Sequence, residues 1–198
     1  MKKIYFLMVA ALLIAMPSCK KADKADNNGN GQNQEQTDQA RVLEDFEDGG
    51  ILTWTGADGC QFSVVDNPSK TGINTSAKVG KYITGTNQWD FVWTSGFGAK
   101  DETFEFADFD KDGYVIKVDV YAPVAGMPIY CKFEGVKVPA KEITSVKTTK
   151  VNEWETLEFD YEPMGVVNGA YKNLVFCVDA GGTTDGTVVY LDNVRQVK

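Results

Sequence analysis

The side chains of this 198-residue chain that could do chemistry are carboxylates and aromatic rings. Asp and Glu number 28 against 20 Lys and Arg, which gives a net charge of −8, and there is no His. Without His the chain lacks the commonest general base and transition-metal ligand, and no Ser-His-Asp set can form. Any catalysis would depend on carboxylates, and an acidic chain without basic clusters is not expected to bind nucleic acid.

Two carboxylate pairs, Glu153/Glu155 and Glu158/Asp160, have the residue types of a glycosidase or lyase site. Both pairs follow the alternation of a β-strand, as solvated carboxylates on its exposed face do. We therefore expect a protein that is not an enzyme, and a carboxylate-based glycosidase or lyase is the alternative.

A second acidic motif, Asp108 to Gly113, reads D-x-D-x-D-G, and Asp119 follows at the twelfth position. This is the front half of an EF-hand calcium loop. The segment after it, VIKVDVY, has the alternation of a strand, whereas an EF-hand needs a helix there. We expect an acidic turn that leads into a strand.

Aromatic residues are spaced so that several share one face of a strand. In QWDFVWTS, Trp89, Phe91 and Trp93 lie on the same side by the period-2 rule. This strip is either an exposed platform or part of the core, and the loop before Trp89 favours exposure of that ring. Trp54, after the Gly49-Gly50 turn, is expected to line the same cleft.

The segment 113–134 predicts two strands around a turn at residues 122–128. Ile116, Val118 and Val120 fall on one face of the first strand. The polar face shared by the two strands is expected to carry Tyr121, Tyr130, Lys132 and Glu134. Each tyrosine could instead place its ring in the core.

Short alternating runs separated by Gly, Pro, Asn and Asp continue through the rest of the chain, for example ETLEFDYE, NLVFCVD and TVVYLDNVRQV. About a dozen short strands at this spacing predict an all-β fold, a β-sandwich or jelly roll. NLVFCVD is almost continuously apolar and predicts a central strand. The last run must pair inside a sheet for the domain to close.

The N-terminal forty residues are not expected to form part of this fold. Residues 1–18 have a basic start and an apolar stretch too short to span a membrane, as a signal peptide does. The sequence before Cys19 resembles a bacterial lipoprotein cleavage site, which implies lipidation of Cys19, and an ordinary secretory signal is the alternative. Residues 19–40 predict a flexible linker, and residues 41–198 predict one domain.

Three cysteines remain beyond Cys19, namely Cys60, Cys131 and Cys177. An odd number cannot pair completely. We expect buried free thiols, with one disulfide as the alternative.

Three blocks in order resemble the galactose-binding-like jelly-roll carbohydrate-binding modules of bacterial, Bacteroidetes-like lipoproteins. They are VLEDFEDG, then VVDNPSKTGINTSAKVGKYITG with WDFVW, then VVYLDNVRQV. The resemblance implies a glycan-binding protein that captures polysaccharide or oligosaccharide without cleaving it. It also implies a bacterial outer-membrane location at the cell surface, held by the lipid anchor alone, with glycan-degrading enzymes as possible neighbours in polysaccharide utilisation.

The same resemblance implies a structural calcium ion between the first and last strands, with Glu47 and Asp192 as carboxylate ligands. Otherwise these two residues are ordinary solvated carboxylates. Sugars need flat rings for their C–H faces and polar groups for their hydroxyls, so the side-chain types and strand positions favour as glycan-binding residues Trp89, Trp93, Trp54, Tyr121, Tyr130, Lys132 and Glu134. A structural or adhesive lipoprotein that binds protein partners is the alternative.

Overall fold

The computed structural model describes residues 40–47, 50, 52–95, 108–136, 138–182 and 185–198. All of them belong to the unit formed by residues 36–198. The signal peptide, Cys19 and nearly all of the linker lie outside the described residues.

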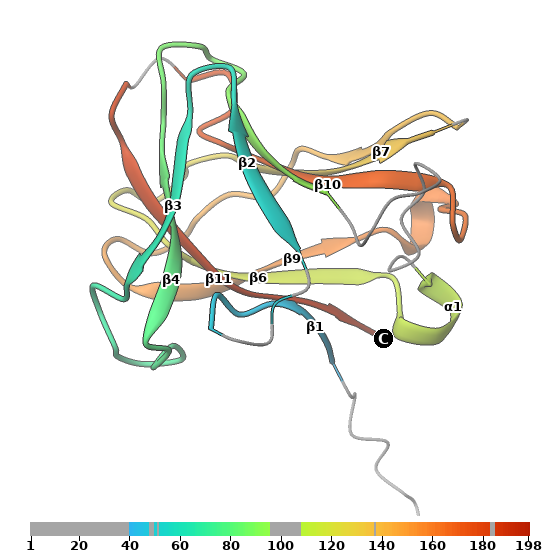
Figure 1. The fold of residues 1–198 in the computed structure, drawn as a ribbon, viewed down its shortest axis with the longest axis horizontal. Coiled ribbons are helices and arrows are strands. Elements are labelled where there is room, and N and C mark those ends of the chain that lie inside the picture. The colour runs from blue at the N-terminus through green and yellow to red at the C-terminus, as the bar shows by residue number, and fades with distance from the viewer. Residues whose placement is uncertain (1–39, 48–49, 51, 96–107, 137, 183–184) are drawn as a thin grey trace, which may run out of the picture. The chain divides into compact units, whose positions relative to one another are not determined.

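The described chain is an antiparallel β-sandwich of two layers (Figure 1). Sheet A has the strand order β3-β4-β11-β6-β9, and β1 also pairs with β11. Its strands are β1 (Arg41–Glu44), β3 (Gln61–Asp66), β4 (Lys78–Ile83), β6 (Val115–Tyr121), β9 (Trp154–Asp160) and β11 (Val188–Val197). The all-β jelly-roll prediction is confirmed.

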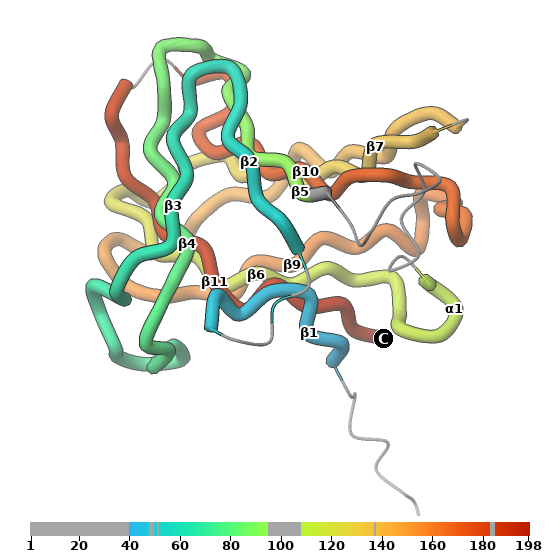
Figure 2. The backbone as a smooth tube through the Cα atoms, viewed as in Figure 1, coloured from blue at the N-terminus to red at the C-terminus, as the bar shows by residue number. Residues whose placement is uncertain are grey.

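Sheet B has the order β2-β5-β10-β7-β8. Its strands are β2 (Thr53–Ala57), β5 (Phe91–Ser95), β7 (Ile129–Gly135), β8 (Lys141–Ile143) and β10 (Tyr171–Val178). Figure 2 shows β5 beside β10 in the upper layer. The predictions that NLVFCVD and TVVYLDNVRQV form interior strands are confirmed, since β10 and β11 each pair on both sides.

The segment 113–134 does not form the expected hairpin. β6 pairs with β9 and β11 in sheet A, whereas β7 pairs with β8 and β10 in sheet B. Residues 122–128 therefore cross from one sheet to the other. The predicted apolar face of β6 is confirmed, because Ile116, Val118 and Val120 are fully buried. However, β6 and β7 lie in different sheets, so their apolar faces meet the core from opposite sides.

Helical structure among the described residues is limited to α1 (Phe109–Asp112) and the 3-10 turn η1 (Glu162–Met164). Asp108 caps α1 by accepting a hydrogen bond from the Lys111 amide at 3.2 Å. Gly113 follows at φ 99°, where a Cβ would lie 2.0 Å from the Val197 carbonyl oxygen. The D-x-D-x-D-G motif is thus an acidic turn before a strand, as predicted. No helix in the described part of the chain has the length and apolarity needed to cross a membrane.

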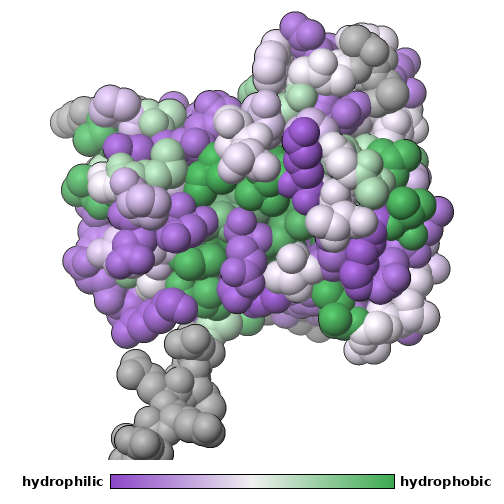
Figure 3. Space-filling view, turned by 180° about the vertical axis from the view of Figure 1, so that it is seen from behind, coloured by the Kyte–Doolittle hydropathy of each residue, from purple (hydrophilic) through white to green (hydrophobic). Residues whose placement is uncertain are grey.

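The core lies between the sheets and is built from the inward residues of both. Its largest fully buried side chains include Tyr82, Tyr161, Tyr171, Phe133, Phe159 and Phe176. Partly buried hydrophobic residues such as Ile143, Val146 and Met164 pack against it. Figure 3 shows hydrophobic side chains reaching the surface between polar ones on the side turned away in Figure 1.

Candidate functional site

The outer face of sheet B carries a row of aromatic and polar side chains. On β5, Val92 and Thr94 are fully buried, so Phe91 and Trp93 point outward. The strand register places Trp93 opposite Val175 on β10, Val175 opposite Lys132 on β7, and Lys132 opposite Glu142 on β8. The sandwich thus brings residues from four strands into one line across the sheet.

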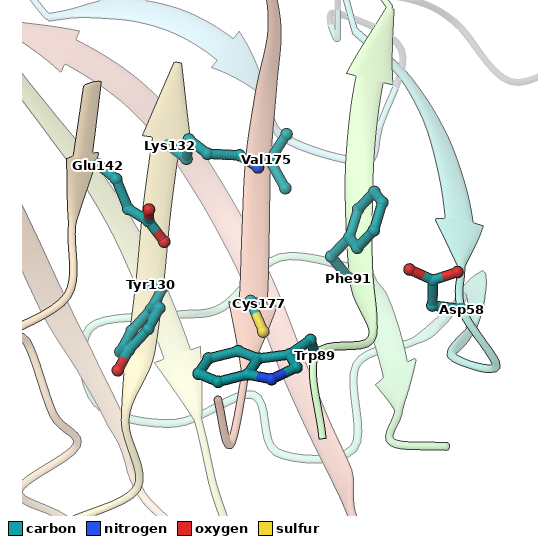
Figure 4. A pocket seen from close by; sticks show the side chains of 8 residues that line it. All are labelled: Asp58, Trp89, Phe91, Tyr130, Lys132, Glu142, Val175 and Cys177. Carbon is teal, nitrogen blue, oxygen red and sulfur yellow. The ribbon is translucent and has the colours of Figure 1, made fainter. Parts of the chain in front are cut away.

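A cavity of about 240 Å³ lies on this face. The side chains that line it come from the loop before β5, from β5, β7, β8 and β10, and from the turn after β2 (Figure 4). They are Asp58, Trp89, Phe91, Tyr130, Lys132, Glu142, Val175 and Cys177. We call Trp89, Phe91, Trp93 and Tyr130 the platform, because their rings belong to this face of sheet B.

Trp89 is the most exposed ring of the platform, with 49% of its surface accessible. It stands 6.4 Å from Tyr130 between ring centroids, and the two planes are inclined by 41°. The predicted exposure of Trp89 is confirmed. Trp93 is half-buried on the same face, next to the cavity rather than among its lining residues.

The loop that carries Trp89 is held in place by hydrogen bonds of the residues before and after it. The Asn87 side chain accepts from the Trp89 amide at 3.0 Å, and the Gly181 amide donates to the Gln88 carbonyl at 2.8 Å. Asp90, which is 2% exposed, accepts from the Tyr82 hydroxyl at 2.5 Å. Burial and this carboxylate raise the pKa of Tyr82, so its hydroxyl stays protonated as the donor. The ring is therefore presented by a fixed loop.

Lys132 and Glu134 form the polar part of the face. The Lys132 ammonium lies 3.2 Å from the Glu134 carboxylate and 5.9 Å from the centroid of Phe91. Asn173 donates to Glu134 at 2.8 Å. Burial raises the pKa of Glu134, but the hydrogen bonds from Asn173 and Lys132 outweigh it, and the net effect lowers this pKa. Trp89, Trp93, Tyr130, Lys132 and Glu134 thus share one face, as predicted.

Two of the predicted binding residues lie elsewhere. Tyr121 is on β6 in sheet A, where its ring packs against Trp154 and Tyr190 at 5.5 and 6.0 Å. It cannot share a surface with Tyr130, because their strands belong to different sheets. The expectation that Tyr121 joins this polar face is wrong.

Trp54 is opposite Thr94 on β5, whose side chain is buried, so its ring points inward from sheet B. It stacks on Phe62 at 5.3 Å, and its Nε1 donates to the Glu44 carboxylate at 3.0 Å. It lines a different cavity, of about 490 Å³, together with Phe46 and Phe62. The expectation that Trp54 lines the cleft of Trp89 is wrong.

Sequence reasoning missed several contributors to this face, Val175 among them. Asp58 and Glu142 flank the cavity, Cys177 lies within it, and Asn173 orients Glu134. The Asp58-Gly59 turn signal and the alternation of the run around Glu142 were visible in the sequence, but neither shows which sheet a strand joins. Cys60, Cys131 and Cys177 are free thiols, as predicted. Cys60 and Cys131 are buried, and Cys177 is half-buried.

The predicted calcium ligands both contact the segment 74–78. Glu47 accepts from the amides of Ala77 and Lys78 at 2.6 and 2.8 Å. Asp192 is fully buried, accepts from the Asn74 side chain at 2.6 Å, and has its pKa raised by burial. The described residues contain no group of three or more His, Cys, Asp or Glu side chains that could hold a metal. A calcium ion here would take most of its six to eight oxygens from elsewhere, chiefly backbone carbonyls.

The carboxylate pairs considered for catalysis lie in and around β9 of sheet A, away from the platform. Glu153 pairs with Lys150, and Glu158 pairs with Lys117 at 2.7 Å. Glu155 is 7% exposed and accepts from the Thr149 amide and hydroxyl and from the Lys150 amide. These carboxylates therefore have structural partners.

The sequence matches no protein-family model and no curated protein sequence. Solved structures with a similar fold include an N-terminal fragment of endo-1,4-β-D-xylanase 10B from Clostridium thermocellum, with CBM22-1 and GH10 modules and bound xylohexaose. Its TM-score is 0.54 at 13% identity, over 81% of this chain and 28% of that chain. The match thus covers less than a third of that chain.

A second similar structure is a mutant of the family 29 carbohydrate-binding module CBM29-2, with a TM-score of 0.50 at 13% identity. The match covers 81% of this chain and 92% of that chain. These likenesses define the class of fold, which is the jelly-roll β-sandwich found in carbohydrate-binding modules.

Proposed function

We propose that this domain binds polysaccharide on the outer face of sheet B and does not cleave it. The observation that carries the proposal is the platform itself, in which the exposed Trp89 and the half-buried Tyr130 lie beside Lys132 and Glu134. Flat rings can lie against the C–H faces of sugars, while the charged groups receive hydrogen bonds from, or donate them to, hydroxyls. The cavity is smaller than the roughly 300–1,000 Å³ of pockets that enclose drug-sized ligands, which suits a chain that extends beyond it.

The test is affinity electrophoresis of the protein against xylan, mixed-linked β-glucan, hydroxyethylcellulose and galactomannan. Xylan is included because the similar xylanase fragment was solved with xylohexaose. We expect retardation by at least one polymer and no release of reducing ends or unsaturated products. If none of these polymers retards the protein, binding of protein partners becomes the better account. If products are released, the domain is an enzyme.

We also propose that Cys19 carries lipid and tethers the domain to the bacterial outer membrane at the cell surface, near glycan-degrading enzymes. This rests on the sequence pattern before Cys19. Labelling with radioactive palmitate should mark the protein, and Cys19→Ala should abolish the label. Surface exposure is measured by protease treatment of intact cells.

A structural calcium ion is the third part of the proposal, with Glu47 and Asp192 as ligands. The fully buried Asp192 supports it, because a cation would compensate the cost of burying this carboxylate. We expect the melting temperature to fall in EGTA and to recover with calcium but not with magnesium. A melting temperature unaffected by EGTA would refute the calcium site.

A further inference from the structure

Two carboxylates flank the platform at opposite ends, and neither is neutralised. Asp58 is in the turn between β2 and β3, and Glu142 is on β8 at the other edge of the sheet (Figure 4). Both line the cavity and are exposed. Neither makes a hydrogen bond or an ion pair with any residue in the described part of the chain.

Backbone structure fixes where both residues sit at the edges of the cavity. Asp58 and Gly59 have φ of 55° and 102°, and the Cys60 amide donates to the Ala57 carbonyl at 3.2 Å. This is a tight two-residue turn, in which Asp and Gly are favoured. Glu142 is held by its pairing with Lys132 across β7 and β8. The charges are therefore built into the rim of the site.

The one cation among the residues that line the cavity cannot offset them. Lys132 is paired with Glu134 at 3.2 Å. Lys172 also acts on Glu134 and lowers its pKa, so this face has three carboxylates (Asp58, Glu134 and Glu142) against two ammonium groups, a net charge of −1. The whole chain, at −8, adds a field of the same sign.

We infer that Asp58 and Glu142 set the charge selectivity of the platform, which accepts uncharged polysaccharide chains and repels chains that carry uronic acids or sulfate. The inference rests on the proposed function and names its substrate class. Repulsion between two like charges about 8 Å apart in water lowers a binding constant by a factor of about two. Two carboxylates facing several charged sugars should therefore weaken binding about three- to tenfold at low salt. Salt screens charges that are farther apart than the Debye length, which is about 8 Å at 0.15 M. Raising the salt concentration should therefore remove most of this difference in affinity.

The experiment compares matched neutral and anionic polymers by isothermal titration calorimetry at 20 and 300 mM NaCl. The probes are hydroxyethylcellulose against carboxymethylcellulose, and arabinoxylan against glucuronoxylan. For the wild-type protein we expect the anionic member of a bound pair to bind three- to tenfold more weakly at 20 mM. The two affinities should converge at 300 mM.

The decisive variant is Asp58→Asn with Glu142→Gln, which keeps the turn and the strand while removing both charges. It should bring the affinities for the neutral and anionic polymers together at 20 mM NaCl. The matched control is Asp66→Asn with Glu158→Gln, which removes two exposed charges from sheet A and should leave the difference intact. Circular dichroism checks that both variants are folded.

If the wild-type protein binds the neutral and the anionic polymer equally well at 20 mM NaCl, the inference is wrong. The proposed function still holds in that case, because the neutral polymer binds. A difference that persists in the Asp58/Glu142 variant, or that the control removes equally, would also overturn the inference and would assign the effect to the overall charge. Failure of the neutral polymers as well as the anionic ones would overturn both proposals.

Discussion

Replacing Trp89 by Ala removes the most exposed ring of the platform and should weaken glycan binding about 5- to 15-fold. A Trp side chain has about 150–250 Å² of surface, and 49% of Trp89 is accessible. About 75–120 Å² is therefore available, and a sugar stacked on one face would cover about half of it. At about 25 cal/mol per Å² this amounts to about 1–1.5 kcal/mol, which gives the stated factor.

The assay is calorimetric titration with the polymer that gives the strongest retardation in electrophoresis. Trp89→Phe should retain part of the affinity, because a smaller flat ring remains. Tyr121→Ala is the matched control, since it removes an aromatic ring from sheet A, and its binding should equal that of the wild type. Unchanged affinity in Trp89→Ala, or a loss in folded Tyr121→Ala as large as that predicted for Trp89→Ala, would refute the placement of the site.

Three further predictions follow from the same contacts. Trp54→Ala should lower the free energy of unfolding by about 2–4 kcal/mol in urea titrations, because it opens the cluster around Phe62, while binding by the folded protein stays unchanged. Cys131, fully buried with its pKa raised to about 12 by that burial, should resist iodoacetamide at pH 8 in the native protein and react once unfolded; rapid native labelling would contradict this. Because the net effect of burial and hydrogen bonds lowers the pKa of Glu134, its ionised form contributes stability above its unfolded pKa of about 4.3 and loses it as the pH falls. Wild type should therefore be more stable than Glu134→Gln at pH 7, and the two should converge near about pH 3; a constant difference would disprove the linkage.

The faces of individual strands were predictable because the alternation of side chains is a local property. Phe91 and Trp93 share the outer face of β5, and Val118 and Val120 share the inner face of β6, as the period of two requires. Strand pairing is set by long-range contacts instead. The Pro and Gly residues of the segment 122–128 suit a hairpin as well as a crossing between sheets, and this ambiguity misplaced Tyr121.

The direction of an aromatic ring depends on which face of its strand meets the core. Trp54 sits between Thr53 and Thr55, and this pattern already favoured an inward ring; the preceding turn led the prediction outward. Asp58 and Glu142 were not identified, because the sequence does not show that strand pairing places these two exposed acids beside the platform.

Both ends of the domain leave from the layer opposite the platform. β1 begins at Arg41 beside Gln196 of β11 in sheet A, and β11 ends at Val197 (Figure 1). An attachment made ahead of Arg41 or behind Lys198 thus starts from the far layer. The protein can be immobilised on a sensor chip, or fused to a reporter enzyme, by either end with its aromatic surface left open to large polymers.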